Sequence, residues 1–538
     1  MKKKPRGFDK LLNEKVASRH SEDLKAIYDL AVRLYEAGRF SEAVPLLRRV
    51  LKDEPNQFVA LFALGISLRR LKQLDEGATA LNRAIALKPD FFEAHYNLGL
   101  LLNEQGLADE AAHAFRRAID LRPDVSSAHS NLLMALQYSS GLTTERWREA
   151  LIAFAQCFPP TPPTTYANAP DPERVLRIGY VSPDFYQHSC AWFIEPLLKA
   201  HDRKQIEVFC YSQVASPDVV TARLRALSDG WREIVHHEDE KVATLISEDH
   251  IDILVDCAGH SACNRLGVFA RKPAPVQVSW LGYPASTGLS AVDYRLSDPW
   301  LTPPDTSEYF SETIWNLEQS AHCYGPPLDA PAVAPAPVLK RGQITFGSFN
   351  NLTKVGRETV ALWAAVLQAI PESRLLLKAH QASDLSVQGN LTTAFGAYGV
   401  LPQRIAFIGK APTVKTHLAY YAQIDIALDT FPYNGATTTL ESLWMGVPVV
   451  SLIGERAASR YGLAFLSAVG LRELAATDLD QFVATAVALA GDLERLVGLR
   501  NTLRGTLGSS TLCDAASFAQ TVENAYRQMW RHWCANSG

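Results

Sequence analysis

The chain has 538 residues, of which 47% are hydrophobic and 20% are charged, and its formal net charge is -4 at pH 7. This length is too great for one hydrophobic core and predicts two to four domains in a globular protein. The weakly acidic balance excludes bulk attraction to nucleic acid, and the lack of any run of about 18 apolar residues argues against a membrane span. The basic start, Lys2–Lys4 and Arg6, is followed by no apolar segment, so no secretory signal is expected.

The eight cysteines are scattered along the chain without a C-x-x-C pair. Such pairs are the usual framework of structural zinc sites, so the sequence predicts no zinc site. Nothing in the sequence suggests export, and we therefore expect reduced thiols in a cytoplasmic protein.

Small and apolar residues recur every 34 positions in the first part of the chain. The period is seen at Ala26, Ala60, Ala94 and Ala128, at Leu30, Leu64 and Leu98, at Gly65 and Gly99, and at Pro55, Pro89 and Pro123. A 34-residue period with small residues at helix crossings and a closing proline is the tetratricopeptide signature. We expect three helix-turn-helix repeats over Ser21–Asp124, a degenerate fourth over Ala128–Phe158, and hence an all-α tetratricopeptide superhelix over residues 1–158.

Beyond a proline-rich linker at residues 159–174, short β-branched runs alternate with helical stretches. A first α/β domain, residues 175–325, has predicted strands at Leu176–Val181, Ile206–Tyr211, Ile251–Val255 and Val276–Trp280. After a second linker, residues 326–341, a second α/β domain over residues 342–514 has predicted strands at Ile344–Ser348, Ser373–Lys378, Ile405–Ile408, Ile424–Leu428 and Pro448–Leu452. Parallel sheets bind ligands at the carboxyl ends of their strands, so we expect a ligand cleft between these domains. A C-terminal helix, residues 515–538, is expected to cross back over their junction.

The segment from Asp429 to Pro448 has the clearest chemical pattern. A predicted strand ends near Asp429, a glycine-containing turn follows, and Thr437–Thr439 stand at the start of a helix that Gly446 and Pro448 end. Free N–H groups and hydroxyls at a helix start can hold a phosphate, although the threonines could equally serve only as caps. Glu441 lies one turn further along the helix, where a carboxylate suits a ribose diol.

Together with Gly179–His188, Pro273–Pro284 and Ser348–Lys354, this segment resembles the O-GlcNAc transferase family, and the motifs occur in the family's order. The resemblance implies that the α/β part has the GT-B fold, in which two Rossmann-like domains face a cleft. It implies inverting transfer of GlcNAc from UDP-GlcNAc to Ser or Thr hydroxyls of proteins, without a metal or other cofactor. The partners would be the nucleotide sugar and a protein or peptide acceptor held by the repeats.

The resemblance also indicates the residues of the site. His188 is expected to bind the sugar or take the proton of the acceptor hydroxyl, and Lys354 to offset the charge on the departing diphosphate. Donor binding is assigned to Asn351, Ala411, His417, Thr437, Thr438, Glu441, Gly282 and Pro284. His260 is a weaker candidate, for which a structural role at the start of a helix is favoured. The Asp478-Leu479-Asp480 triplet is interpreted as a helix cap rather than a metal-binding D-x-D motif.

Several positions depart from the animal members of the family. Ala436 stands where they have a histidine, Thr353 where they have an aromatic residue, and Glu441 where they have an aspartate; one residue more separates Ala411 from His417. The short repeat array resembles that of a bacterial-type member. These departures leave two alternatives open, a protein O-fucosyltransferase that uses GDP-fucose and a non-catalytic repeat adaptor. Repeats this short could also mediate contacts between copies of the chain.

Overall fold

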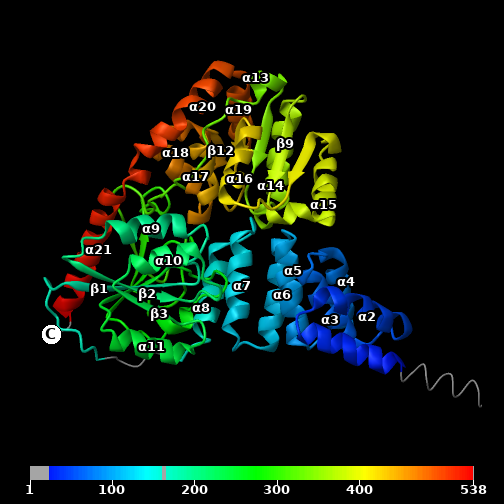
Figure 1. Ribbon diagram of the computed structural model, residues 1–538, viewed down its shortest axis with the longest axis horizontal. Helices are drawn as coiled ribbons and strands as arrows, with labels where there is room; N and C mark the ends of the chain where they lie inside the picture. The colour runs from blue at the N-terminus through cyan, green and yellow to red at the C-terminus, as the bar shows by residue number, and fades with distance from the viewer. Residues whose placement is uncertain (1–22, 160–164, 537–538) are drawn as a thin grey trace, which may run out of the picture. The chain divides into compact units, whose positions relative to one another are not determined.

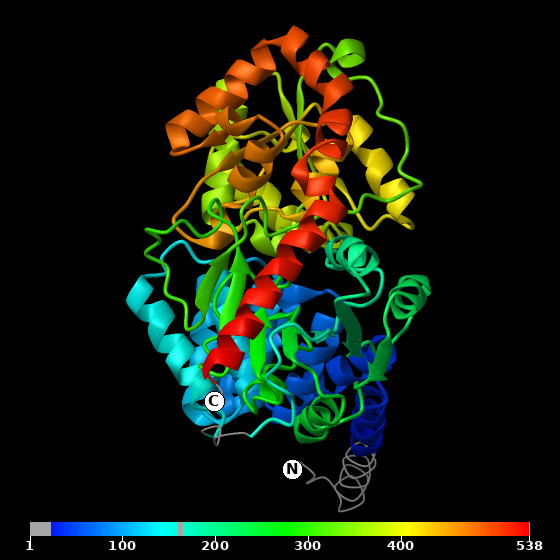
Figure 2. The same cartoon turned by 90° about the vertical axis from the view of Figure 1, so that its left-hand side faces the viewer.

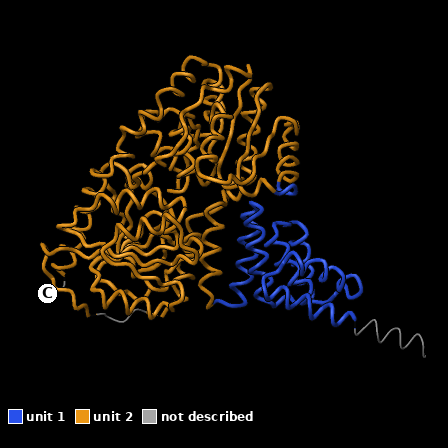
Figure 3. The backbone as a smooth tube through the Cα atoms, in the orientation of Figure 1, with its two compact units in different colours: residues 1–123, 384–387 blue, residues 124–383, 388–538 orange. Residues whose placement is uncertain are grey.

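The computed structural model of this protein describes residues 23–159 and 165–536. The basic residues Lys2–Lys4 and Arg6, the expected start of the first repeat at Ser21, and part of the first expected linker lie outside the described residues. By their contacts the residues form two compact units (Figure 3), Met1–Pro123 with Asp384–Val387, and Asp124–Ser383 with Gln388–Gly538.

The first unit consists of helical hairpins. Helical residues 23–36 are followed by α2 (Phe40–Asp53), α3 (Phe58–Arg70), α4 (Leu74–Leu87), α5 (Phe92–Glu104) and α6 (Ala108–Leu121). A Cβ atom on Gly65 would lie 2.6 Å from Leu81, and one on Gly99 would lie 2.7 Å from Phe115. The helices of each hairpin thus cross where the repeat places its glycines, and the predicted tetratricopeptide repeat is confirmed.

The first repeat differs from the next two in what covers it. Ala60 and Ala94 are fully buried, and Leu64 and Leu98 are less than a tenth exposed. Their counterpart Leu30 is 43% exposed. Solenoid units bury their apolar faces only against neighbouring units. In the second and third repeats the preceding hairpin covers these positions. In the first repeat no described residue completes the cover of Leu30.

Helices α7 (Ser126–Gln137) and α8 (Thr144–Ala155) belong to the second unit. The Thr143 side chain caps α8 by accepting a hydrogen bond from the Arg146 backbone N–H. This helical pair encloses His260 of the first α/β domain, whose Nδ1 lies 3.0 Å from Ser130 Oγ and whose ring packs 4.5 Å from that of Phe154. The degenerate fourth repeat is therefore the segment that joins the α/β part of the chain.

The first α/β domain has a seven-stranded parallel sheet in the order β3-β2-β1-β4-β5-β6-β7. Strands β1, β2 and β3 of this sheet are labelled in Figure 1. Its strands are β1 (Leu176–Ser182), β2 (Ile206–Ser212), β3 (Gly230–Glu233), β4 (Ile253–Asp256), β5 (Val276–Ser279), β6 (Tyr294–Ser297) and β7 (Thr313–Asn316). Its helices are α9 (Ala191–Ala200), α10 (Val219–Ala226), α11 (Asp239–Glu248) and α12 (Leu266–Phe269). The order of the first six strands is that of a Rossmann sheet.

The second α/β domain repeats this order in a six-stranded parallel sheet, β10-β9-β8-β11-β12-β13. Its strands are β8 (Thr345–Ser348), β9 (Arg374–Lys378), β10 (Ile405–Ile408), β11 (Ile426–Leu428), β12 (Val449–Leu452) and β13 (Ala475–Ala476). Its helices are α13 (Val338–Arg341), α14 (Arg357–Ala369), α15 (Leu385–Gly396), α16 (Val414–Ala419), α17 (Thr437–Trp444), α18 (Tyr461–Ala468), α19 (Leu479–Gly491) and α20 (Leu493–Gly508). The predicted fold of helical repeats followed by two Rossmann-like domains is confirmed.

The C-terminal helix α21 (Ala515–Asn536) returns to the first α/β domain and lies across its strands (Figure 2). Its residues Phe518, Val522, Tyr526 and Trp530 are buried in the same apolar core as Ile178 of β1. The return of the chain, expected from the sequence, therefore rests on burial of one aromatic face of α21. Within the described ranges, no helix combines the length and the apolar character needed to cross a membrane.

Candidate active site

A cavity of about 700 Å³ lies between the two α/β domains. Its walls come from the loops that follow β1 and β5 of the first sheet and β8, β9, β10 and β11 of the second. These loops meet because the carboxyl ends of the parallel strands of both sheets face the same space.

Lys354 is held in this cavity by groups of the loop after β11. Its Nζ donates a hydrogen bond of 2.7 Å to the carbonyl of Asn434 and lies 4.1 Å from the centre of the Tyr433 ring. Burial lowers the pKa of Lys354 to about 8, and the charge of nearby Asp429 opposes that shift. The result is a fixed, poorly hydrated cation, which is suited to stabilising negative charge on a ligand.

The loop after β11 is organised by the buried carboxylate of Asp429. It accepts hydrogen bonds from the Gly435 backbone N–H at 2.7 Å and from the Ser451 hydroxyl at 2.7 Å. Burial raises the pKa of Asp429 to about 6. A Cβ atom on Gly435 would lie 2.9 Å from Asn350 Oδ1, so a larger residue there would displace that side chain.

The loop leads directly into α17, which begins at Thr437 as the sequence predicts. Ala436 precedes it and provides no side-chain cap, and Thr439 donates its hydroxyl to the Gly435 carbonyl. No described residue accepts a hydrogen bond from the backbone N–H of Thr437 or Thr438. The helix start therefore presents free donors to the cavity, which is the arrangement that binds phosphate groups.

His417 and Glu441 form the other half of this wall. Lys378 Nζ lies 2.5 Å from His417 Nδ1, and His417 Nε2 lies 2.9 Å from a Glu441 carboxylate oxygen. An ammonium group only donates, so Nδ1 accepts and the ring proton resides on Nε2, directed at Glu441. The Phe349 ring lies 6.0 Å from the His417 ring and lines the cavity, so it offers an aromatic surface to a nucleobase. The Tyr421 ring, 5.9 Å from that of His417, is buried.

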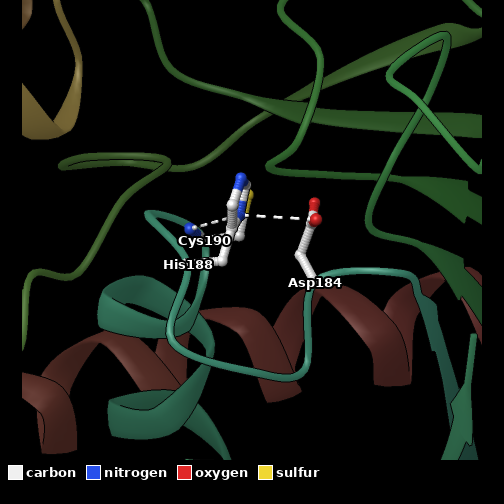
Figure 4. A group of neighbouring side chains, drawn as sticks. All are labelled: Asp184, His188 and Cys190. Atoms are coloured by element: carbon white, nitrogen blue, oxygen red, sulfur yellow. Dashed lines mark hydrogen bonds and ion pairs between the residues drawn. The ribbon is translucent and has the colours of Figure 1, made fainter. Parts of the chain in front are cut away.

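The first α/β domain contributes His188 on the loop after β1. The His188 side chain is 37% exposed, and its Nδ1 lies 3.4 Å from Asp184 Oδ1. Figure 4 shows this edge of the ring turned toward Asp184 and the other ring nitrogen pointing away from it. In the same domain, Gly282 lies so close to the backbone after β4 that a Cβ would be 2.2 Å from the Cys257 carbonyl oxygen. The glycine is therefore needed for an approach to the protein's own backbone.

Nine of the ten residues predicted for the site line this cavity: His188, Gly282, Asn351, Lys354, Ala411, His417, Thr437, Thr438 and Glu441. Pro284 does not line it. Pro284 is buried beside Trp280, Arg295 and Tyr461 at a much smaller cavity of about 10 Å³. The turn after β5 exposes Leu281 and Gly282 and then runs inward, which removes Pro284 from the site.

Two weaker candidates have structural roles. His260 is buried between Ser130 and the Thr287 carbonyl, and burial lowers its pKa to about 3. Asp478 caps α19 by accepting a hydrogen bond from the Gln481 backbone N–H, which confirms the interpretation of the D-x-D triplet as a cap.

The sequence did not single out several residues that the structure brings to the cavity: Cys190, His322, Phe349, Lys378, Lys410, Tyr433 and Tyr461. Lys378 could have been identified, because it ends a predicted strand and strand ends face the cleft. Tyr433 lies inside the segment that carries the phosphate-binding pattern. His322 and Tyr461 follow no such rule and depend on the path of the folded chain.

Two Rossmann-like domains face one cavity, and free N–H groups at a helix start lie on its wall, which defines a two-domain α/β protein with a candidate nucleotide site. The sequence model of glycosyl transferase family 41 matches residues 156–323 and 337–522. This chain belongs to that family. The tetratricopeptide repeat model also matches, over residues 28–90 and 62–126.

Individual relatives agree with this assignment. A mutant of the Thermobaculum terrenum O-GlcNAc transferase has a similar structure, with a TM-score of 0.86 and 39% identity over 97% of this chain and 99% of that one. The Petunia hybrida protein named probable UDP-N-acetylglucosamine–peptide N-acetylglucosaminyltransferase SPINDLY is 43% identical over 69% of this chain. The corresponding Arabidopsis thaliana protein named SEC is 30% identical over 67%. This chain spans 40% and 38% of the length of these two plant proteins.

Proposed function

We propose that this protein transfers N-acetylglucosamine from UDP-GlcNAc to serine or threonine hydroxyls of proteins, with inversion at the anomeric carbon. The observation that supports this most strongly is the pairing of Lys354 with the free start of α17 on one wall of the cavity, opposite His188 on the other. A diphosphate bound between Lys354 and α17 would place its sugar toward His188.

The donor's nucleoside would occupy the corner formed by His417 and Glu441. The Glu441 carboxylate accepts from His417 at one oxygen, which leaves its other oxygen for a ribose hydroxyl. The loop with Ala411 follows β10 and lines the same part of the cavity, so its backbone is available to the edge of the base.

In the transfer step, the acceptor oxygen attacks the anomeric carbon while the bond to the diphosphate breaks. The acceptor proton passes to a base, for which we propose the His188 nitrogen that points away from Asp184 (Figure 4). This role requires the tautomer with the ring proton on Nδ1, facing Asp184, in which the hydrogen bond that Nδ1 accepts from the Cys190 backbone N–H at 3.3 Å is given up. The charge that develops on UDP is stabilised by the Lys354 ammonium and the N–H groups of Thr437 and Thr438. These groups supply the positive potential that a divalent cation supplies elsewhere, and the proposal therefore includes no metal cofactor.

Tetratricopeptide hairpins bind extended peptides in many proteins, and we propose that the repeats of the first unit hold the protein acceptor.

We also propose that the protein is located in the cytoplasm of a bacterial cell. All eight cysteines are free thiols, which is compatible with that reducing compartment.

The test is calorimetric titration of the full chain with UDP, GDP, UDP-GlcNAc and GDP-fucose, without added metal. Selective binding of UDP and UDP-GlcNAc supports the proposal. Selective binding of GDP and GDP-fucose would replace it with fucosyl transfer, because the base pocket around Ala411 and His417 would then take guanine. Absence of binding by all four ligands would favour a non-catalytic adaptor.

A further inference from the structure

Three side chains with metal-binding atoms lie together beside the cavity (Figure 4). Asp184, His188 and Cys190 all come from the short segment between β1 and α9, and one potential ligand atom of each lies within 4.8 Å of the other two. His188 and Cys190 line the cavity. The three groups are brought together by one tight loop, whose shape is fixed by a hydrogen bond from the Asp184 backbone N–H to the Ser182 hydroxyl at 3.0 Å.

The chemistry of the three groups is selective. A carboxylate, an imidazole and a thiolate are the three ligand types that zinc takes in proteins, at bond lengths of about 2.0 to 2.3 Å. In a tetrahedron of such bonds the ligand atoms lie roughly 3.5 Å apart. Asp184 Oδ1 and His188 Nδ1 are already 3.4 Å apart. Small side-chain rotations would therefore complete three corners of a tetrahedron, and the fourth corner could be taken by water from the cavity.

The charge of the loop also favours a cation. The Asp184 residue is only 9% exposed, and its pKa is raised by burial. Its ion-pair partner among the described residues is His188, and its other polar neighbour is the Cys190 thiol. A buried carboxylate without a lysine or arginine partner is costly, and a bound divalent cation would offset that cost.

We propose that Asp184, His188 and Cys190 form a binding site for zinc or a similar soft divalent cation, with the fourth coordination position open to the cavity. On binding, the Cys190 S–H bond breaks, its proton leaves to solvent, and a metal–thiolate bond forms; the carboxylate and His188 Nδ1 contribute lone pairs, and nothing is oxidised or reduced. Because the thiol loses its proton on binding, the affinity should rise with pH.

Metal binding at His188 has a consequence that rests on the proposed function. When Nδ1 binds the metal, the ring proton is confined to the other nitrogen, which then cannot accept the proton of the acceptor hydroxyl. The cation is therefore an inhibitor of transfer and not a cofactor. The site couples the reaction to the availability of zinc.

Metal binding is measured first, independently of activity, on the full chain freed of metal with a chelator. Titration with Co²⁺ should give a thiolate-to-cobalt charge-transfer absorption in the near ultraviolet, and competition between Zn²⁺ and a chromogenic chelator should give one tight site. The nearly isosteric C190S variant should lose the absorption, and Asp184→Asn should weaken zinc binding at least about tenfold. The matched control is Cys263→Ser, because Cys263 is an exposed cysteine of the same domain.

Absence of a tight site, or an absorption that persists in C190S, would overturn the proposal. Circular dichroism of each variant shows whether a loss of metal binding is due only to misfolding. Transfer rates are then measured with and without Zn²⁺, each variant against its own metal-free rate. We expect Zn²⁺ to inhibit the wild type, a chelator to reverse this inhibition, and C190S to show none. Tight zinc binding without inhibition would refute the role assigned to His188. The metal-free chain is also titrated with UDP. If UDP binds, an absent metal site or an absent inhibition counts against the metal proposal alone and leaves the proposed function standing.

Discussion

The two walls of the cavity come from domains with the same strand order, yet they hold their polar groups differently. In the second α/β domain Lys354 is fixed by a carbonyl and a tyrosine ring, and His417 is fixed on both nitrogens. In the first, the His188 side chain is more than a third exposed and its contact with Asp184 is long.

A rigid wall suits a diphosphate, because its charge must be stabilised by groups already in place. A looser wall suits a group that exchanges a proton. The comparison predicts that the second domain governs donor binding and departure, whereas the first governs transfer to the acceptor.

The largest expected effect is that of Lys354→Met. The variant keeps the shape of the side chain and removes the cation, so kcat/KM should fall about 1000-fold. The melting temperature should decrease only slightly, because methionine fills the same space and the lost hydrogen bond to the Asn434 carbonyl contributes about 1 kcal/mol. The matched control, Lys340→Met on the exposed surface of α13, should leave both unchanged. Turnover close to that of the wild type in Lys354→Met would refute the contrast between the walls.

His188→Asn tests the first domain. Loss of a general base should lower kcat about 100-fold. The affinity for UDP, measured by calorimetry, should stay the same, because the variant changes only the wall that faces the acceptor. A marked loss of UDP affinity would show that His188 binds the donor instead.

The pH dependence of kcat/KM should reveal the state of Lys354 in the free enzyme. Because burial lowers the pKa of this lysine to about 8, the charged form is present below pH 8 and is lost above it. The rate constant should therefore fall about tenfold per pH unit above pH 8. In Lys354→Arg, whose guanidinium remains charged, the decline should disappear; a decline at the same pH would have to be assigned to another group.

Glu441→Gln sharpens the division within the second domain. Loss of the carboxylate charge should weaken UDP binding about tenfold, or about 1.4 kcal/mol, and should change kcat much less than Lys354→Met does. Calorimetry and steady-state kinetics on one preparation give both quantities. The proposed contact with ribose would be contradicted if the variant bound UDP as tightly as the wild type.

The last prediction concerns folding stability at acid pH and leaves the reaction itself aside. The pKa of His260 is lowered to about 3 in the folded chain, so the unfolded state binds the proton first as the pH falls below about 6.5. His260 should therefore remove stability by about 1.4 kcal/mol per pH unit between pH 6 and pH 4. His260→Gln should be less stable at pH 7 but lose less stability on acidification, as urea unfolding at several pH values would show. Parallel losses in both proteins would contradict this assignment.

Much of the fold followed from local patterns. The period of 34 residues predicted the helical hairpins, and apolar runs predicted β1, β2, β4, β5 and β8–β12. The strands that were not predicted, β3, β6, β7 and β13, lie at or next to a sheet edge. Such strands are stabilised by pairing with a neighbour, and β3, Gly230–Glu233, has no apolar run that could reveal it.

The candidate site was predictable where one segment contains both a strand end and the start of a helix. The loop from Asp429 to Thr438 is such a segment, and so is the loop that ends at Lys354. Lys378 and His417 are in contact although 39 positions separate them in the sequence, and Asp184 approaches Cys190 only because their loop bends. No periodic pattern in the sequence predicts these contacts.

The sequence by itself determined the repeat architecture, the two parallel sheets and the helix start at Thr437, because each depends on the spacing of residue types along a continuous stretch of chain. The tertiary structure alone decided that Pro284 turns inward, that His260 contacts both helices of the degenerate repeat, and that Asp184, His188 and Cys190 lie together beside the cavity. These outcomes depend on burial and on distances between side chains, and both are set only when the whole chain has packed.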